Sequence, residues 1–257
     1  MVVSPLPIWN KENFLDFASD KGRPVVGLFP ERRVLKSGRE SLWYVNWRGT
    51  CSIASELHRL GEFVLDFAEG KNLEPDCFYG VPEGATKLGI ITQFLYTNDT
   101  GYGKDIMPMG RGGGAKGHGD PKDKYFVGAP QGNIVMIEDV TTTGLSSLEE
   151  IAKLRELKDA NITALIALTN RMEVTPKVGL DNPELVARFA GVYESLTGKA
   201  YGHGGLSVER VFEDLGIRYL AMSTGPELLR RIKIEPKMIL AIEKEFETFG
   251  VPRSKLR

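Results

Sequence analysis

The sequence is poor in cysteine and has no excess of either charge, and each absence argues against a class of protein. Its two cysteines, Cys51 and Cys77, do not form a Cys-x-x-Cys spacing. We therefore expect no disulfide framework and no cysteine-bound metal, which is typical of a reducing compartment. The 33 basic and 34 acidic residues leave a formal net charge of -1, which gives no reason to expect a nucleic acid or an anionic membrane as partner. No apolar run approaches the length of a membrane span, so we expect a soluble cytoplasmic protein.

A Gly-x-x-x-x-Gly-Lys-Ser/Thr loop is also absent, which argues against an ATPase. What the sequence does contain is an alternation of helical and extended apolar patterns. An antiparallel hairpin is expected from 25–29 and 41–46, and further strands at 77–81, 134–137, 164–168 and 218–222. Helices are expected at 9–20, 52–69, 84–97, 145–158, 183–197, 207–214, 225–232 and 236–248. This alternation predicts an α/β fold, a mainly parallel sheet flanked by helices, within one domain spanning 1–257.

One segment, IVMIEDVTTTGLSS at 134–147, combines an expected strand with polar residues suited to a ligand. Glu138 and Asp139 follow the apolar strand, where ligands bind in open α/β sheets. Thr141, Thr142, Thr143 and Gly144 then precede a helix whose first N–H groups suit a phosphate. Because carboxylates accept hydrogen bonds from sugar hydroxyls, the pair points to a ribose phosphate. The alternative is that the acids cap the helix and the threonines form a turn.

The same segment resembles the 5-phosphoribosyl-1-diphosphate (PRPP) motif of the type I phosphoribosyltransferases, strand-Glu/Asp-Asp-Val-x-Thr-x-Gly. The resemblance implies that Glu138 and Asp139 hold the ribose hydroxyls and that Asp139 has a catalytic role. It assigns the 5-phosphate to Thr141, Thr142, Thr143, Gly144, Leu145 and Ser146. Glu138 is a departure, because orotate phosphoribosyltransferases usually carry Asp there.

Two further segments resemble the orotate-binding parts of the orotate phosphoribosyltransferases. LKSGRESLWYVN at 35–46 is similar to the segment that covers the base, which implies that Lys36, Trp43 and Tyr44 bind orotate. ALTNRME at 167–173 is similar to Leu-x-Asp-Arg-x-Glu, which assigns the orotate carboxylate to Arg171, with Thr142 also at the base. The alternatives are an ordinary hairpin with a solvated turn, and a simple ion pair from Arg171 to Glu173 or another acid.

The remaining matches concern the diphosphate. FYGVPEGATKLG at 78–89 is similar to the family's diphosphate loop, which implies a role for the N–H groups of Glu83, Gly84 and Ala85. The unpatterned stretch 101–132 contains RGGGAKGHGD, similar to the family's mobile catalytic loop. There Lys116 and His118 are implied to cover the leaving diphosphate, and Arg111 to bind PRPP. The alternative for this stretch is a disordered loop with incidental cations.

These matches keep the family's order and imply the type I phosphoribosyltransferase fold. In that fold 1–50 forms a hood over the base, 51–223 an α/β core with an insert at 174–206, and 224–257 a helical tail. The implied reaction transfers phosphoribosyl from PRPP to orotate in pyrimidine biosynthesis. Magnesium would be held mainly by PRPP oxygens without a direct protein ligand, in a homodimer whose loop 110–120 acts on the neighbouring site. A transferase for another base and a non-catalytic PRPP-sensing regulator remain alternatives, the latter because of the triple glycine at 112–114.

Overall fold

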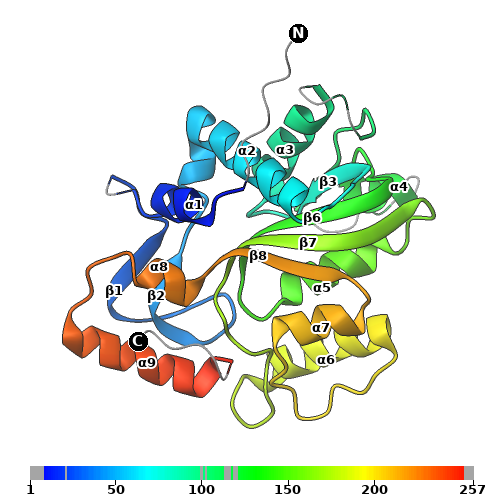
Figure 1. Ribbon diagram of the computed structural model, residues 1–257. Helices are drawn as coiled ribbons and strands as arrows, with labels where there is room; N and C mark the ends of the chain where they lie inside the picture. The colour runs from blue at the N-terminus through cyan, green and yellow to red at the C-terminus, as the bar shows by residue number, and fades with distance from the viewer. Residues whose placement is uncertain are drawn as a thin grey trace.

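The computed structural model describes residues 9–20, 22–98, 101, 103–112, 117 and 121–251. Its centre is a four-stranded sheet in the order β3-β6-β7-β8, in which every neighbouring pair is parallel (Figure 1). The strands are β3 (Cys77–Gly80), β6 (Gly132–Thr141), β7 (Ala160–Asn170) and β8 (Arg218–Thr224). The predicted parallel sheet is therefore confirmed; β6, β7 and β8 cover their expected segments, and β3 ends one residue earlier than expected.

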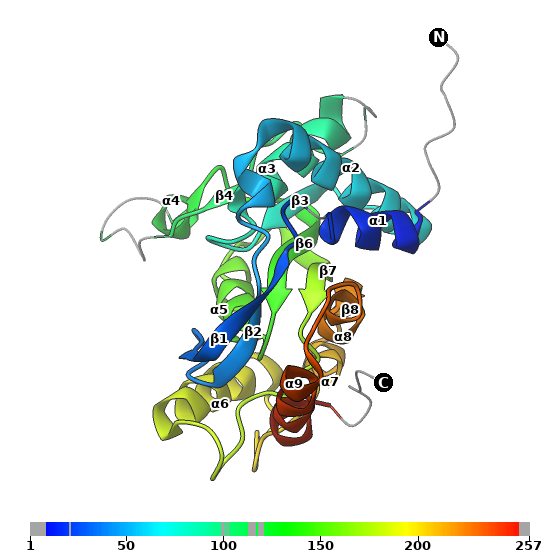
Figure 2. The same cartoon turned by 90° about the vertical axis from the view of Figure 1, so that its left-hand side faces the viewer.

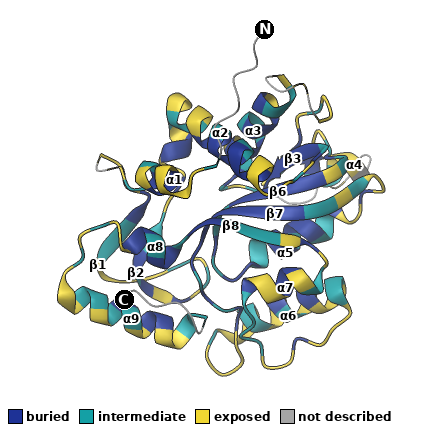
Figure 3. Cartoon of the chain, in the orientation of Figure 1, coloured by how far each residue is buried: buried dark blue, intermediate teal, exposed yellow. Residues whose placement is uncertain are grey.

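Helices cover both faces of this sheet, because its strands are apolar on both sides. On one face lie α1 (Lys11–Ala18), α2 (Ala54–Gly70) and α3 (Thr86–Asn98), and on the other α5 (Leu145–Leu154), α6 (Pro183–Thr197) and α7 (Val208–Asp214) (Figure 1). Alternate residues of β6 divide between two cores: Val135 and Ile137 join the first, Ile134 and Met136 the second. Figure 3 shows the sheet as a dark, buried layer between half-exposed helices.

The amino-terminal hairpin and the carboxy-terminal helices lie together beyond the carboxyl ends of the strands (Figures 1 and 2). The hairpin, here called the hood, pairs β1 (Val26–Val34) antiparallel with β2 (Glu40–Val45). After β8 come α8 (Gly225–Leu229) and α9 (Pro236–Phe249), and α9 packs against β2, with the rings of Trp43 and Phe246 5.7 Å apart. The carboxy-terminal helix α9 thus holds the hood.

The stretch 101–132, for which the sequence predicted no element, has defined parts, and the helix expected at 183–197 within the insert is confirmed. The stretch 101–132 contains an antiparallel pair, β4 (Met109–Gly110) with β5 (Phe126–Val127), and a short helix α4 (Pro121–Tyr125). The insert contains α6, which begins where Asn182 caps the helix ahead of Pro183 and ends at Gly198, whose φ is 68°. A 3-10 turn, η1 (Thr50–Ser52), leads into α2. Within the described ranges, no helix has both the length and the apolarity to cross a bilayer.

Candidate active site

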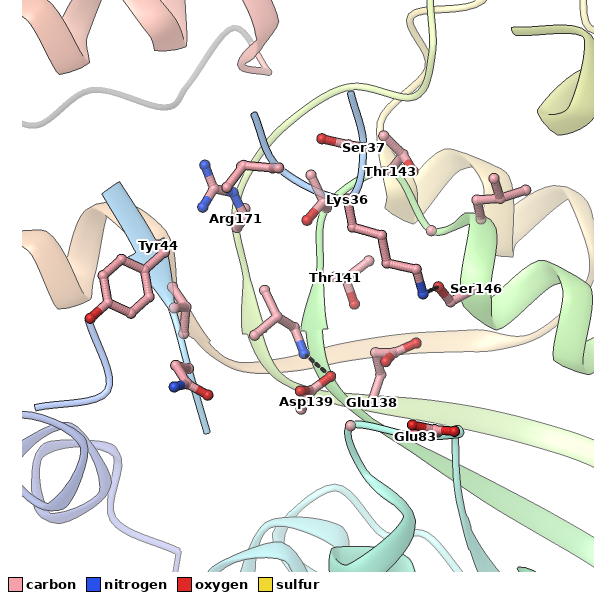
Figure 4. A pocket seen from close by; sticks show the side chains of 18 of the residues that line it. Lys36, Ser37, Tyr44, Glu83, Glu138, Asp139, Thr141, Thr143, Ser146 and Arg171 are labelled. Carbon is pink, nitrogen blue, oxygen red and sulfur yellow. Dashed lines mark hydrogen bonds between the residues drawn. The ribbon is translucent and has the colours of Figure 1, made fainter. Parts of the chain in front are cut away.

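A cavity of about 470 Å³ lies between the end of β6 and the hood (Figure 4). It occupies the carboxyl edge of the sheet, where open α/β folds bind their ligands. Its wall is built from the hood, the loop after β3, the segment from β6 into α5, the end of β7 and the insert. The lining residues are Leu35, Lys36, Ser37, Tyr44, Val45, Asn46, Arg48, Pro82, Glu83, Gly84, Glu138, Asp139, Val140, Thr141, Thr142, Thr143, Gly144, Leu145, Ser146, Arg171 and Leu185.

Glu138 and Asp139, whose carboxyl groups interact with each other, have different further partners in the cavity wall. We expected the strand to end at residue 137, but β6 continues to Thr141, so Glu138 and Asp139 alternate across it. Glu138 faces α5, where its Oε2 accepts a hydrogen bond of 2.7 Å from the Ser147 hydroxyl. Asp139 faces the loop after β3, and a Cβ placed on Gly84 would collide with its carboxylate. Each acid therefore belongs to a different part of the cavity wall.

The environment of Glu138 makes its carboxyl group hold a proton unusually well. The residue is only 6% exposed. Burial raises the pKa of Glu138 well above its usual range, and the neighbouring charge of Asp139 adds to the effect, while the bond from Ser147 and the charge of Lys36 oppose it. A hydroxyl donor or a cation arriving in the cavity would favour the charged form.

The turn from β6 into α5 offers unpaired N–H groups to the cavity. Gly144 adopts a left-handed conformation with φ 83°, which residues with a Cβ rarely adopt. The first helical bond of α5 runs 3.0 Å from the Leu148 N–H to the Gly144 carbonyl, so the N–H groups of 145–147 precede it. The ammonium of Lys36 lies 3.4 Å from Ser146 Oγ (Figure 4). These groups fit an anion of phosphate size.

Arg171 lines the cavity from beneath the hood. Its Nε donates to Glu173 Oε1 at 2.7 Å, and its Nη2 to Ser41 Oγ at 3.2 Å. The guanidinium stacks on Trp43, with 3.7 Å from Cζ to the ring centroid. The ion pair given as the alternative for Arg171 is present, and the same side chain also reaches the cavity.

Three comparisons bear on the family. No protein-family model matches the sequence. The orotate phosphoribosyltransferase of Agathobacter rectalis is 33% identical over 167 residues, which cover 64% of this chain and 71% of that enzyme. The chain belongs to the orotate phosphoribosyltransferase family. The orotate phosphoribosyltransferase of Hamiltonella defensa matches at 27% identity over 257 residues, 96% of this chain and 98% of that one.

The fold of the orotate phosphoribosyltransferases matches as well. The crystal structure of orotate phosphoribosyltransferase from Francisella tularensis superposes with a TM-score of 0.60, covering 93% of this chain and all 100% of that one. At 18% sequence identity this likeness concerns the fold alone. The expected type I phosphoribosyltransferase fold is confirmed.

The positions of two residues assigned by resemblance to the family differ from expectation. Resemblance assigned Trp43 to orotate, but this residue is 1% exposed and its ring lies against the guanidinium of Arg171, outside the cavity lining. Strand alternation explains this, since neighbouring residues of β2 face opposite sides and Tyr44 takes the cavity side. Ala85 is fully buried and its N–H donates to the Val81 carbonyl at 3.1 Å, so this N–H is not free for a diphosphate.

The described residues include only part of the segment that resembles the family's catalytic loop. Arg111 does not line the cavity; its Nε donates to the carbonyl of Asp123, on α4, at 3.0 Å. Lys116 and His118 lie outside the described residues. By contrast, the cavity does bring together Lys36, Tyr44, Glu83, Gly84, Glu138, Asp139, Arg171 and all six residues of 141–146.

Sequence reasoning about the orotate phosphoribosyltransferase family missed three residues that matter to the site. Arg48 is an exposed cation of the lining. It lies two residues after the matched hood segment 35–46, and this proximity could have indicated it. Ser147 is fully buried against Glu138, and its place in the first turn of the helix was visible in the sequence. Leu185 reaches the lining from the insert, and nothing in the sequence indicated it.

Proposed function

We propose that this protein transfers the 5-phosphoribosyl group of PRPP to N1 of orotate, producing orotidine 5'-monophosphate and pyrophosphate for pyrimidine biosynthesis. The observation that carries the proposal is that one cavity joins a phosphate nest, paired carboxylates and a stacked arginine. Relatives named orotate phosphoribosyltransferase support the choice of base. We place the reaction in the cytoplasm, in keeping with two cysteines that are both free and buried.

PRPP would lie along the β6 side of the cavity. Its 5-phosphate would accept hydrogen bonds from the N–H groups and hydroxyls of 141–146, with the Lys36 ammonium close by. Its ribose hydroxyls would donate to Asp139 and Glu138, and its diphosphate would lie toward Glu83 and Gly84. Lys36, which resemblance assigned to orotate, is thus proposed to serve the phosphate in the conformation observed.

Orotate would lie between Tyr44 and Arg171. A guanidinium has five N–H groups, and Glu173, Ser41 and the Trp43 carbonyl engage one on each nitrogen of Arg171. Two N–H groups remain for the carboxylate of orotate. Thr142 would contact the ring, and the phenol of Tyr44 would give it a flat surface.

Magnesium fits this site as an ion shared with the substrate. Among the described residues no group of three or more His, Cys, Asp or Glu side chains could hold a metal. Mg²⁺ often keeps several waters and uses one or two carboxylates together with substrate phosphates, and Asp139 with Glu138 can supply such a pair. When bound, it would neutralise charge on the diphosphate.

The chemistry asks mainly for positioning. N1 of orotate attacks C1' while the bond from C1' to the diphosphate oxygen loosens, so the protein must align the two substrates and stabilise separating charge. The hood would exclude water from the sugar. We also propose a homodimer in which loop 110–120, with Lys116 and His118, closes over the diphosphate of the neighbouring subunit.

The test is orotate consumption by the purified protein with PRPP and magnesium, followed by ultraviolet absorbance, with uracil and adenine in parallel. Loss of orotate only in the presence of PRPP is the expected result. Consumption of another base instead would make the protein a transferase of different specificity. PRPP binding without turnover of any base would favour the PRPP-sensing regulator.

A further inference from the structure

The insert reaches back to the hood through a buried ion pair. Asp181, just before α6, accepts two parallel hydrogen bonds from Arg39 of the hood, 2.7 Å from Nε to Oδ1 and 2.9 Å from Nη2 to Oδ2. The two side chains are 2% and 3% exposed. A two-pronged bond of this kind fixes both the position and the plane of the guanidinium.

Arg39 uses its remaining nitrogen to hold a second acid. Its Nη1 donates to Glu173 Oε2 at 3.0 Å, and the other oxygen of Glu173 accepts from Arg171 Nε at 2.7 Å. Two carboxylates and two guanidiniums therefore alternate from the insert to the cavity. Burial acts to lower the pKa of Arg39, but hydrogen bonding to Asp181 and the charge of Glu173 together raise that pKa above its ordinary value. These four side chains are here called the row: Asp181, Arg39, Glu173 and Arg171. Each of them is buried against an oppositely charged partner, so each depends on its neighbours.

We propose that Asp181 is a positioning residue for base binding: it fixes Arg39, which fixes Glu173, which aims Arg171 at the carboxylate of the base. This inference rests on the proposed function and gives the insert a role in it. Without Asp181, the guanidinium of Arg39 keeps only Glu173 as a charged partner and competes with Arg171 for that carboxylate. Arg171 then loses the bond that holds its plane against Trp43. Leu185, also from the insert, lines the same cavity.

Asp181→Asn tests the proposal, because it removes the charge and keeps the size of the side chain. We expect the KM for orotate to rise about tenfold, with kcat and the KM for PRPP within about twofold of the parent. Tyr193→Phe is the matched control in the same insert: it removes the 2.7 Å bond from the hydroxyl to Asp214 and touches no member of the row. It should leave both KM values unchanged. Equal changes in both KM values for Asp181→Asn, or the same change in the control, would overturn the proposal.

Glu173→Gln extends the test one link closer to the cavity and also serves if Asp181→Asn does not fold. It should raise the KM for orotate more than Asp181→Asn does, since it acts on Arg171 directly. In an Arg171→Lys background, Asp181→Asn should add less than about twofold, because the two changes act through one path. Full additivity would contradict the row.

A measurement that needs no turnover separates this proposal from the proposed function. The Nε–H resonance of Arg171, assigned by its loss in Arg171→Lys, should shift in Asp181→Asn and stay in place in Tyr193→Phe. An unshifted resonance in Asp181→Asn overturns the row. If the resonance shifts but the protein consumes no orotate, the coupling of Asp181 to Arg171 is supported and only the proposed substrate is rejected.

Discussion

The two sides of the cavity are built in opposite ways. The side proposed for the phosphate, residues 138–147 and here called the phosphate side, is one continuous stretch in which strand, turn and helix follow each other directly. The side proposed for the base, here called the base side, consists of Tyr44 and Arg171 of the lining together with Ser41, Trp43 and Glu173, which contact Arg171. It joins the hood to the end of β7 and depends on Asp181 and Glu245 from still later segments. Glu138 and Ser147 of the phosphate side are nine residues apart, whereas the hydrogen bonds that join the hood to Glu173 and Arg171 on the base side span more than a hundred residues. A site can therefore combine a motif visible in sequence with a framework that only folding assembles.

The largest effect should come from the base side. Arg171→Ala removes the stacked guanidinium, and kcat/KM for orotate should fall about a hundredfold to a thousandfold, while the affinity for PRPP, measured by calorimetry, should change less than about threefold. Arg188→Ala, which removes an exposed pair with Glu149, is the control and should be neutral. Equal losses for both substrates would remove Arg171 from the carboxylate role.

The next effect should fall on the phosphate side. Gly84→Ala forces a Cβ into the Asp139 carboxylate, so kcat/KM for PRPP should drop about tenfold to a hundredfold as the acid or the loop moves aside. Gly49→Ala is the matched control, because Gly49 has an ordinary φ of -61° and open space around it. Normal PRPP kinetics in Gly84→Ala would show that Asp139 tolerates displacement.

A smaller effect, dependent on pH, should follow from Ser147→Ala. Ser147 lowers the raised pKa of Glu138, so its loss should raise that pKa further. If PRPP requires the charged acid, kcat/KM for PRPP falls as the pH falls through the pKa of Glu138, and the fall should begin at higher pH in the variant. At neutral pH we expect about a threefold to tenfold loss. Identical pH profiles would mean that Glu138 does not act as an anion.

A change outside both sides should leave activity within about twofold and alter only stability. Burial raises the pKa of Asp66, on α2, to about 6, above an unfolded value near 3.9. The folded state therefore binds the proton more tightly, and the free energy of unfolding falls as the pH rises through about 6. Asp66→Asn should remove this fall and stabilise the protein by up to about 3 kcal/mol at pH 8 and by less at pH 5, as measured by urea denaturation. A variant less stable at both pH values would refute this.

The contrast between the phosphate side and the base side also explains how much of the fold and of the site could be predicted from the sequence. The sheet, both sets of helices and the placing of 138–146 at the carboxyl edge came from local patterns. Trp43 was assigned to the base although strand alternation puts its side chain on the face of β2 opposite to that of Tyr44. Asp181 and Arg39 lie 142 residues apart, and no local pattern marks either of them as the partner of the other.

The row of alternating charges also affects how substrate binding depends on ionic strength. Two carboxylates and two guanidiniums offset each other within a buried row, so the base side presents fixed donors rather than net charge to an incoming carboxylate. The phosphate side instead lies against an exposed cation, Lys36, whose ammonium is 3.4 Å from Ser146 Oγ. Salt screens the attraction between such a cation and a phosphate over about 10 Å at 0.1 M. Raising the salt concentration should therefore increase the KM for PRPP steeply and the KM for orotate only slightly. A single salt titration would then distinguish the contributions of the two sides of the cavity.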